Sequence, residues 1–161
     1  MSTGRGLRTM TLLTLLISGA AAAAGFKYYP GSTRYTPADT EANRQWTSAL
    51  RPGTTITAWF SSDTFEQVLG FYRAIGREYT PPHAAPPEKL PNGRQLRKTF
   101  LIFDGAPDLI TSREWISIQH PFVGSISRSQ GAPPQYQDVR DVTEIVLTEK
   151  KPVPKQQTQS K

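Results

Sequence analysis

Side chains that could act as nucleophiles or general bases are scarce in this chain. It contains no cysteine, which excludes a thiol nucleophile, and only two histidines, His83 and His120. A serine nucleophile needs such a base, but His83 stands among prolines and alanines and His120 directly precedes a proline. Neither a Gly-x-Ser-x-Gly segment nor a glycine-rich loop for a nucleotide cofactor is present. We therefore predict no catalytic residue and no cofactor.

Carboxylates offer a second kind of chemistry. Asp104 and Asp108 lie close to Gly105, but this segment lacks the alternating acids and final glutamate of a calcium-binding loop. Aspartate and glycine are common in turns, so we interpret the segment as a turn and predict no metal site. A small hydrolase with two facing carboxylates, drawn from Asp104, Asp108 and Glu114, remains an alternative because sequence does not give their separation.

Four aromatic residues form a candidate interaction surface. Tyr28, Tyr29 and Tyr35 lie between residues 26 and 36, which we predict to be an aromatic-rich loop, and Phe71 lies beside the apolar face of a predicted helix. Such rings can stack on a ligand, or they can cover the edge of a core with their hydroxyls in water. If Phe71 is exposed, it is the best anchor for a partner beside the tyrosines.

A basic segment could suggest a nucleic-acid partner. Arg94, Arg97 and Lys98 precede Phe100 and Phe103, an arrangement that RNA-binding sheets use. The same charges also protect an edge strand from pairing with another chain. Because the protein also carries an export signal, we predict no nucleic-acid partner.

The first 24 residues have the three regions of a secretory signal peptide. Arg5 and Arg8 precede an uncharged, leucine-rich stretch, and an alanine block that ends at Ala24 offers a cleavage site. The apolar stretch is too short to span a membrane, although an uncleaved anchor is the alternative. We therefore expect export to the periplasm or the extracellular space, with no transmembrane segment after cleavage.

The mature chain is basic. Signal removal lowers its formal net charge from +6 to +4, and residues 150–161 contain four lysines and no acid, which predicts a disordered tail. Basic character favours loose attraction to anionic polymers or lipid headgroups. Our leading hypothesis is a non-enzymatic binding module whose partner is another envelope protein or an anionic envelope polymer. Attachment to the envelope through the tail is a further alternative.

The most strongly specified element is a helix over residues 61–76. Asp63 is the expected N-cap with Glu66 three residues later, and Gly76 is expected to end the helix in a left-handed conformation. Apolar residues recur at helical spacing, so one face should be buried. These residues are Phe65, Val68, Leu69, Tyr72 and Ile75.

The remaining pattern predicts one α+β domain over residues 25–149. It comprises an antiparallel sheet of about four strands, with the main helix on one face and a second short helix after Thr36. The expected strands, from their alternation, are 54–61, 94–104, 113–120 and 142–149. The proline-rich segment between Gly76 and the second strand, and residues 124–137, are predicted to be loops.

Three short motifs resemble a group of small exported bacterial proteins of unknown function. They are Tyr29-Pro30-Gly31 near the mature start, a strand and helix ending in Phe71-Tyr72-Arg73, and a closing strand Thr143-Glu144-Ile145-Val146-Leu147. The motifs are spread over much of the mature chain, and they concern the core. The resemblance implies an exported protein and assigns no activity or site residue.

Overall fold

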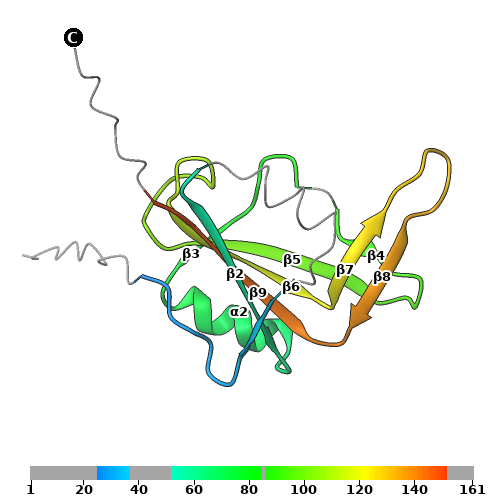
Figure 1. Ribbon diagram of the computed structural model, residues 1–161, viewed down its shortest axis with the longest axis horizontal. Helices are drawn as coiled ribbons and strands as arrows, with labels where there is room; N and C mark the ends of the chain where they lie inside the picture. Colours follow the sequence, from blue (N-terminus) through cyan, green and yellow to red (C-terminus); the bar gives the residue numbers. More distant parts are fainter. Residues whose placement is uncertain (1–24, 37–51, 85, 152–161) are drawn as a thin grey trace, which may run out of the picture.

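The computed structural model describes residues 25–36, 52–84 and 86–151 (Figure 1). Strands account for 46% of these residues and helix for 8%, so the fold is mostly β and the predicted α+β class is wrong. The predicted second helix, the signal peptide and the tail beyond Lys151 lie outside the described residues. Within the described part of the chain, no helix is long and apolar enough to cross a membrane.

Seven strands form one antiparallel sheet, in place of the four predicted. Its order is β1-β2-β9-β6-β5-β3, and β4 also pairs with β5. A separate hairpin of β7 and β8 lies at the right of Figure 1. The strands are β1 (Thr33–Tyr35), β2 (Thr54–Ser61), β3 (Arg77–Tyr79), β4 (Glu88–Lys89), β5 (Gln95–Ile102), β6 (Glu114–His120), β7 (Phe122–Ser127), β8 (Gln135–Arg140) and β9 (Thr143–Lys150).

The strands that were not predicted have weak sequence signals. β1, β3 and β4 are two or three residues long, too short for alternation to be recognised. β7 and β8 expose most of their side chains, so polar residues occur on both faces. Consequently the three segments that we predicted to be loops all contain strands, and the number of strands was underestimated.

The helix α2 (Phe65–Arg73) is shorter than predicted and begins differently. Its N-cap is Thr64, whose side chain accepts a hydrogen bond from the Gln67 backbone while the Gln67 side chain accepts one from the Thr64 backbone. Asp63 is therefore not the cap. Gly76 is not left-handed either, since the helix ends at Arg73 with Ala74 as its C-cap, and Gly76 has no positive φ. A glycine is needed there because an added Cβ would lie 2.6 Å from the Phe103 ring.

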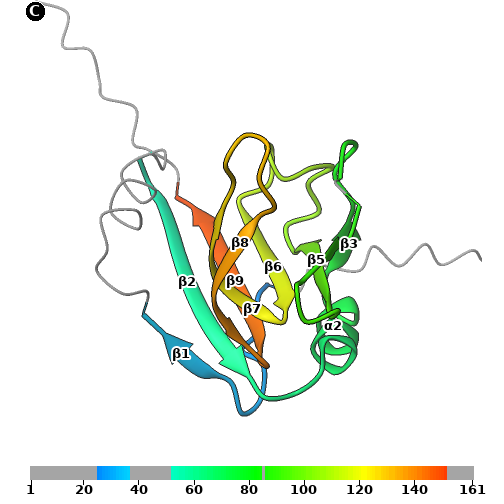
Figure 2. The same cartoon turned by 90° about the vertical axis from the view of Figure 1, so that its right-hand side faces the viewer.

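The core lies between α2 and one face of the sheet; Figure 2 shows the strands spread from β1 to β3, with α2 next to β5. Val68, Leu69 and Tyr72 of the helix are buried, as their spacing predicts. The segment before β1 covers the margin of this core, with the Phe26 ring 5.8 Å from that of Tyr72 and 5.4 Å from that of Trp59. Helix and N-terminal segment together close one face of the sheet.

Candidate functional site

A cavity of about 500 Å³ lies between α2 and the proline-rich loop that follows β3. Phe65, Leu69 and Arg73 contribute from the helix, and residues 95–100 contribute from β5. The remaining lining comes from β3, from the described loop residues and from Glu88 of β4. Four different elements and a loop thus surround one space at the margin of the sheet.

The cavity opens where the outer edge of β5 has no strand partner. β3 pairs with Phe100 to Ile102 and β4 pairs with Gln95 and Leu96, so Arg97 to Thr99 pair only with β6 on their other side. Pairing is interrupted because the loop between β3 and β4 is rich in proline, which lacks the backbone donor that a ladder needs. These three residues, which have no strand partner on the outer edge of β5, all line the cavity.

Side chains of β5 reach the cavity from both faces of the sheet, because successive residues of a strand point to opposite sides. Arg97 lies on the side of the helix, with its guanidinium carbon 4.2 Å from the centre of the Phe65 ring. Lys98 and Phe100 lie on the other side, and the ammonium of Lys98 is 5.5 Å from the Phe100 ring centre. The wall therefore combines aromatic surface with positive charge.

The acids around the cavity are held by arginines. Glu78 bonds with Arg73 at 2.7 Å and accepts a hydrogen bond from the Thr99 hydroxyl at 2.8 Å. Burial by itself would raise the pKa of Glu78, but the bonds from Thr99 and Arg73 outweigh it, so the pKa lies below its ordinary value. Glu78 is thus ionised near neutral pH and is poorly suited to act as a general acid.

Glu88 is held in the same way at the other end of the cavity. It accepts hydrogen bonds from the Tyr136 hydroxyl at 2.6 Å and from Arg128 at 2.9 Å, both from the β7–β8 hairpin and its turn. These bonds lower the pKa of Glu88. Both carboxylates in the lining are therefore ionised and already bonded.

The predicted aromatic surface is divided between two places. The Tyr29 ring lies 5.3 Å from the Phe71 ring, and Tyr28 is 70% exposed with its ring against Trp59. Tyr35 instead packs on Phe60, which points to the opposite face of the sheet from Trp59. Only three of the four predicted residues are neighbours, and none of the four lines the cavity.

Tyr29 and Phe71 have a structural role in this group. The Tyr29 hydroxyl donates to a carboxylate oxygen of Asp63 at 2.7 Å, and this bond raises the pKa of Tyr29 to about 12. Phe71 is half-buried against Tyr29 and Tyr72. Tyr28 is therefore the residue of this group with most of its ring free for a partner.

The three acids of the hydrolase alternative all lie away from the cavity. Asp104 accepts bonds from the Arg113 backbone and the Ser112 hydroxyl, and Asp108 accepts from the Thr111 backbone, as expected of acids in a turn. Glu114 accepts from the Phe26 backbone at 3.3 Å. No group of three metal-ligating residues occurs in the described ranges.

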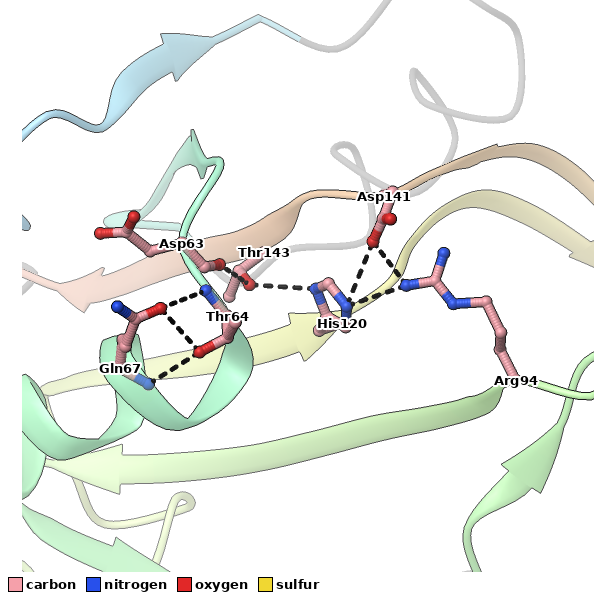
Figure 3. A network of polar contacts seen from close by, with 7 residues as sticks. All are labelled: Asp63, Thr64, Gln67, Arg94, His120, Asp141 and Thr143. Atoms are coloured by element: carbon pink, nitrogen blue, oxygen red, sulfur yellow. Dashed lines mark hydrogen bonds and ion pairs between the residues drawn. The ribbon is translucent and has the colours of Figure 1, made fainter.

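His120 belongs to a polar network rather than to the cavity (Figure 3). Its Nδ1 lies 3.1 Å from the hydroxyl of Thr143, which donates to the Asp63 carbonyl at 2.7 Å. Its Nε2 lies 3.1 Å from Arg94 and 3.5 Å from Asp141. Thr143 is fully buried, so this hydroxyl cannot reach a substrate. His83 lies in the exposed part of the proline-rich loop.

The sequence pointed to Arg97, Lys98 and Phe100 as a basic and aromatic strand. It did not predict the cavity that these residues share with Glu78 and Glu88. A usable signal was the run of prolines beside a basic strand, because prolines interrupt a sheet edge. No family model matches the chain, and no significant match was found among the curated proteins or the solved structures. The geometry of the cavity is therefore the ground for a functional proposal.

Proposed function

We propose that the protein is an exported, non-enzymatic binding module that holds a small ligand in the cavity between α2 and the proline-rich loop. The cavity carries this proposal: at about 500 Å³ it falls within the range of ligand-binding pockets. Phe65, Leu69, Tyr79, Leu96, Phe100 and several prolines supply apolar lining. A few charged groups among such residues are the usual composition of a binding site.

Binding accounts for this cavity better than catalysis does. Among the described residues that line it there is no histidine or serine, and its two carboxylates are each bonded to an arginine. A general acid needs a raised pKa, whereas the pKa values of Glu78 and Glu88 are lowered. The carboxylates of the hydrolase alternative lie elsewhere, so we do not favour that alternative.

The signal-peptide pattern supports a role outside the cytoplasm. The absence of cysteine is compatible with an oxidising compartment, because no thiol is present to form unwanted disulfides. We accordingly place the ligand in the cell envelope or the extracellular medium.

Blocking the cavity tests the proposal. The ¹⁵N-labelled mature chain is titrated with a library of small anionic, cationic and neutral compounds, and the amide shifts of β5 are followed. Ala84 lines the cavity from an exposed loop position, so Ala84→Trp should obstruct it without disturbing the core. Ligands that shift the β5 amides of the wild-type protein should lose this effect in the Ala84→Trp variant.

His83→Trp is the matched control, because it adds the same ring one position earlier in the loop at a residue outside the lining. It should bind like the wild type. A library that leaves the amides of Arg97 to Thr99 unshifted, or shifts that persist unchanged in Ala84→Trp, would show that the cavity is not a binding site.

A further inference from the structure

The charges around the cavity do not cancel. Arg73 is paired with Glu78, Arg97 with Glu66 and Arg128 with Glu88. Lys98 also lines the cavity, and no carboxylate of the described residues lies within ion-pair distance of it. After these three pairs are formed, one positive charge remains at the cavity wall.

One carboxylate that Lys98 influences is that of Glu144 in β9. Gln119 of β6 lies between them, paired with Lys98 on one side and with Glu144 on the other, and all three share one face of the sheet. Burial raises the pKa of Glu144, and Lys98 opposes this only in part. The backbones of Lys98 and Glu144 lie two strand spacings apart, about 10 Å, and no ion pair joins their side chains within the described part of the chain.

The position of Lys98 matches that of an anchor for a charged head group. It lies in the middle of the unpaired stretch of β5, between Leu96 and Phe100 on the same face. Its ammonium is near the Phe100 ring, and prolines of the loop also line the cavity. A ligand that fits would place one anionic group at Lys98 and an apolar or aromatic body against the remaining lining.

We propose that the ligand is an amphiphilic anion, with one negatively charged group bound by Lys98 and an apolar or aromatic body held between α2 and the proline-rich loop. This inference rests on the proposed function and specifies the class of ligand. It assigns Lys98 as the residue that selects anions over neutral compounds of the same shape.

Two dyes with the same ring system test the selection. One is 1-anilinonaphthalene-8-sulfonate, and the other is N-phenyl-1-naphthylamine, which lacks the sulfonate. The anionic dye should bind the mature protein up to about fivefold more tightly, the upper end expected of one partly exposed ion pair. Dissociation constants are measured by fluorescence titration, with a thermal melt to verify that each variant is folded.

Variants identify the residue responsible. Lys98→Met keeps an apolar stem and removes the charge. It should therefore lower the affinity for the anionic dye about fivefold and leave the affinity for the neutral dye unchanged. Lys89→Met makes the same change on β4 at an exposed residue outside the lining, and it should leave the affinities for both dyes unchanged. Ala84→Trp should abolish the binding of both dyes.

The outcomes separate this inference from the proposed function. Equal affinities of the two dyes, or an affinity for the anionic dye that Lys98→Met leaves unchanged, would refute the selection of anions. If Ala84→Trp abolished the binding of both dyes in that case, the cavity would still be upheld as a binding site. Binding of the anionic dye that survives Ala84→Trp would place the dye elsewhere and refute the inference. If neither dye binds, the inference is wrong, and the compound library decides the proposed function independently.

Discussion

His120 connects four parts of the molecule through its two ring nitrogens. Because the Thr143 hydroxyl donates to the Asp63 carbonyl, its oxygen is left to accept a hydrogen from Nδ1 of His120. Nε2 is then the acceptor for the Arg94 guanidinium. The neutral imidazole with its hydrogen on Nδ1 satisfies Thr143 and Arg94, while the Asp141 carboxylate accepts its hydrogen bond from Arg94 (Figure 3).

Protonation of His120 should weaken the fold. Burial lowers the pKa of His120, Asp141 opposes this and Arg94 adds to the lowering. The neutral form is favoured by folding, so its contribution is fully present above the unfolded pKa of about 6.5 and is lost as pH falls through the lower folded value. The free energy of unfolding, measured by denaturant titration, should therefore fall more steeply between about pH 7.5 and 5.5 in the wild type than in His120→Gln.

His83→Gln is the control for this measurement, since it removes a histidine from an exposed loop. Raised pKa values elsewhere, such as that of Glu144, act on all three proteins and cancel in the comparison. If His120→Gln retained the slope of the wild type, the network would have no part in the acid response.

At the scale of elements, two glycines belong to the region of α2: Gly70 lies inside the helix and Gly76 follows it. Their surroundings differ. An alanine Cβ at Gly70 would meet nothing within 4 Å, because this position faces solvent. At Gly76 the added Cβ would lie 2.6 Å from the ring of Phe103, a core residue that is 1% exposed. The same substitution thus has opposite consequences at the two positions.

We expect Gly70→Ala to raise the free energy of unfolding by about 0.5–1 kcal/mol, because alanine loses less backbone entropy in a helix. Gly76→Ala should lower it by about 1–3 kcal/mol, since the buried ring cannot move aside without strain. Chemical denaturation of both variants checks these values. A stable Gly76→Ala variant would mean that the end of the helix can shift away from the sheet.

The strand pattern shows why some elements were predictable. β2, β5, β6 and β9 are seven or eight residues long and lie within two residues of their predicted limits. In β6 the buried residues alternate because one face lies under α2, whereas β2 and β5 also bury adjacent residues on both faces. The short strands β3 and β4 form only where the loop between them returns to β5, so their pairing depends on contacts distant in sequence.

At the scale of the whole molecule, the hairpin of β7 and β8 is joined to the main sheet at two places. At its base, Phe122 packs on Phe60, and the Arg140 guanidinium lies 5.6 Å from the Phe60 ring centre. Farther out, Tyr136 donates to Glu88 beside the cavity. The rest of the hairpin is mostly exposed, whereas β6 and β9 occupy the centre of the seven-stranded sheet.

Hydrogen exchange should therefore differ between these parts. Amides of β7 and β8 are expected to exchange through local opening, while those of β6 and β9 exchange slowest. Tyr136→Phe removes the bond to Glu88 and should speed exchange in the hairpin about two- to tenfold, without changing β6 and β9. Mass spectrometry of peptic fragments measures this, with Tyr28→Phe as a control at an exposed ring. Uniform exchange across both sheets would mean that the hairpin opens only with global unfolding.

The sequence by itself determined the features that depend on neighbouring residues. The alternation of the four long strands and the spacing of Val68, Leu69 and Tyr72 identified most of the buried face, because each is a local geometric period. Local pattern was less reliable for the limits of the helix: the capping box at Thr64 and Gln67 and the close approach of Phe103 to Gly76 were both missed.

Only the tertiary structure decided the class of fold and the candidate site. The cavity forms because the chain leaves β5 after Tyr79 and returns at Glu88, so that Lys98 has no strand partner on the outer edge of β5. No local pattern records which edge of which strand remains open. The candidate site thus arises from pairing between distant segments, and its charge balance depends on which arginine reaches which carboxylate.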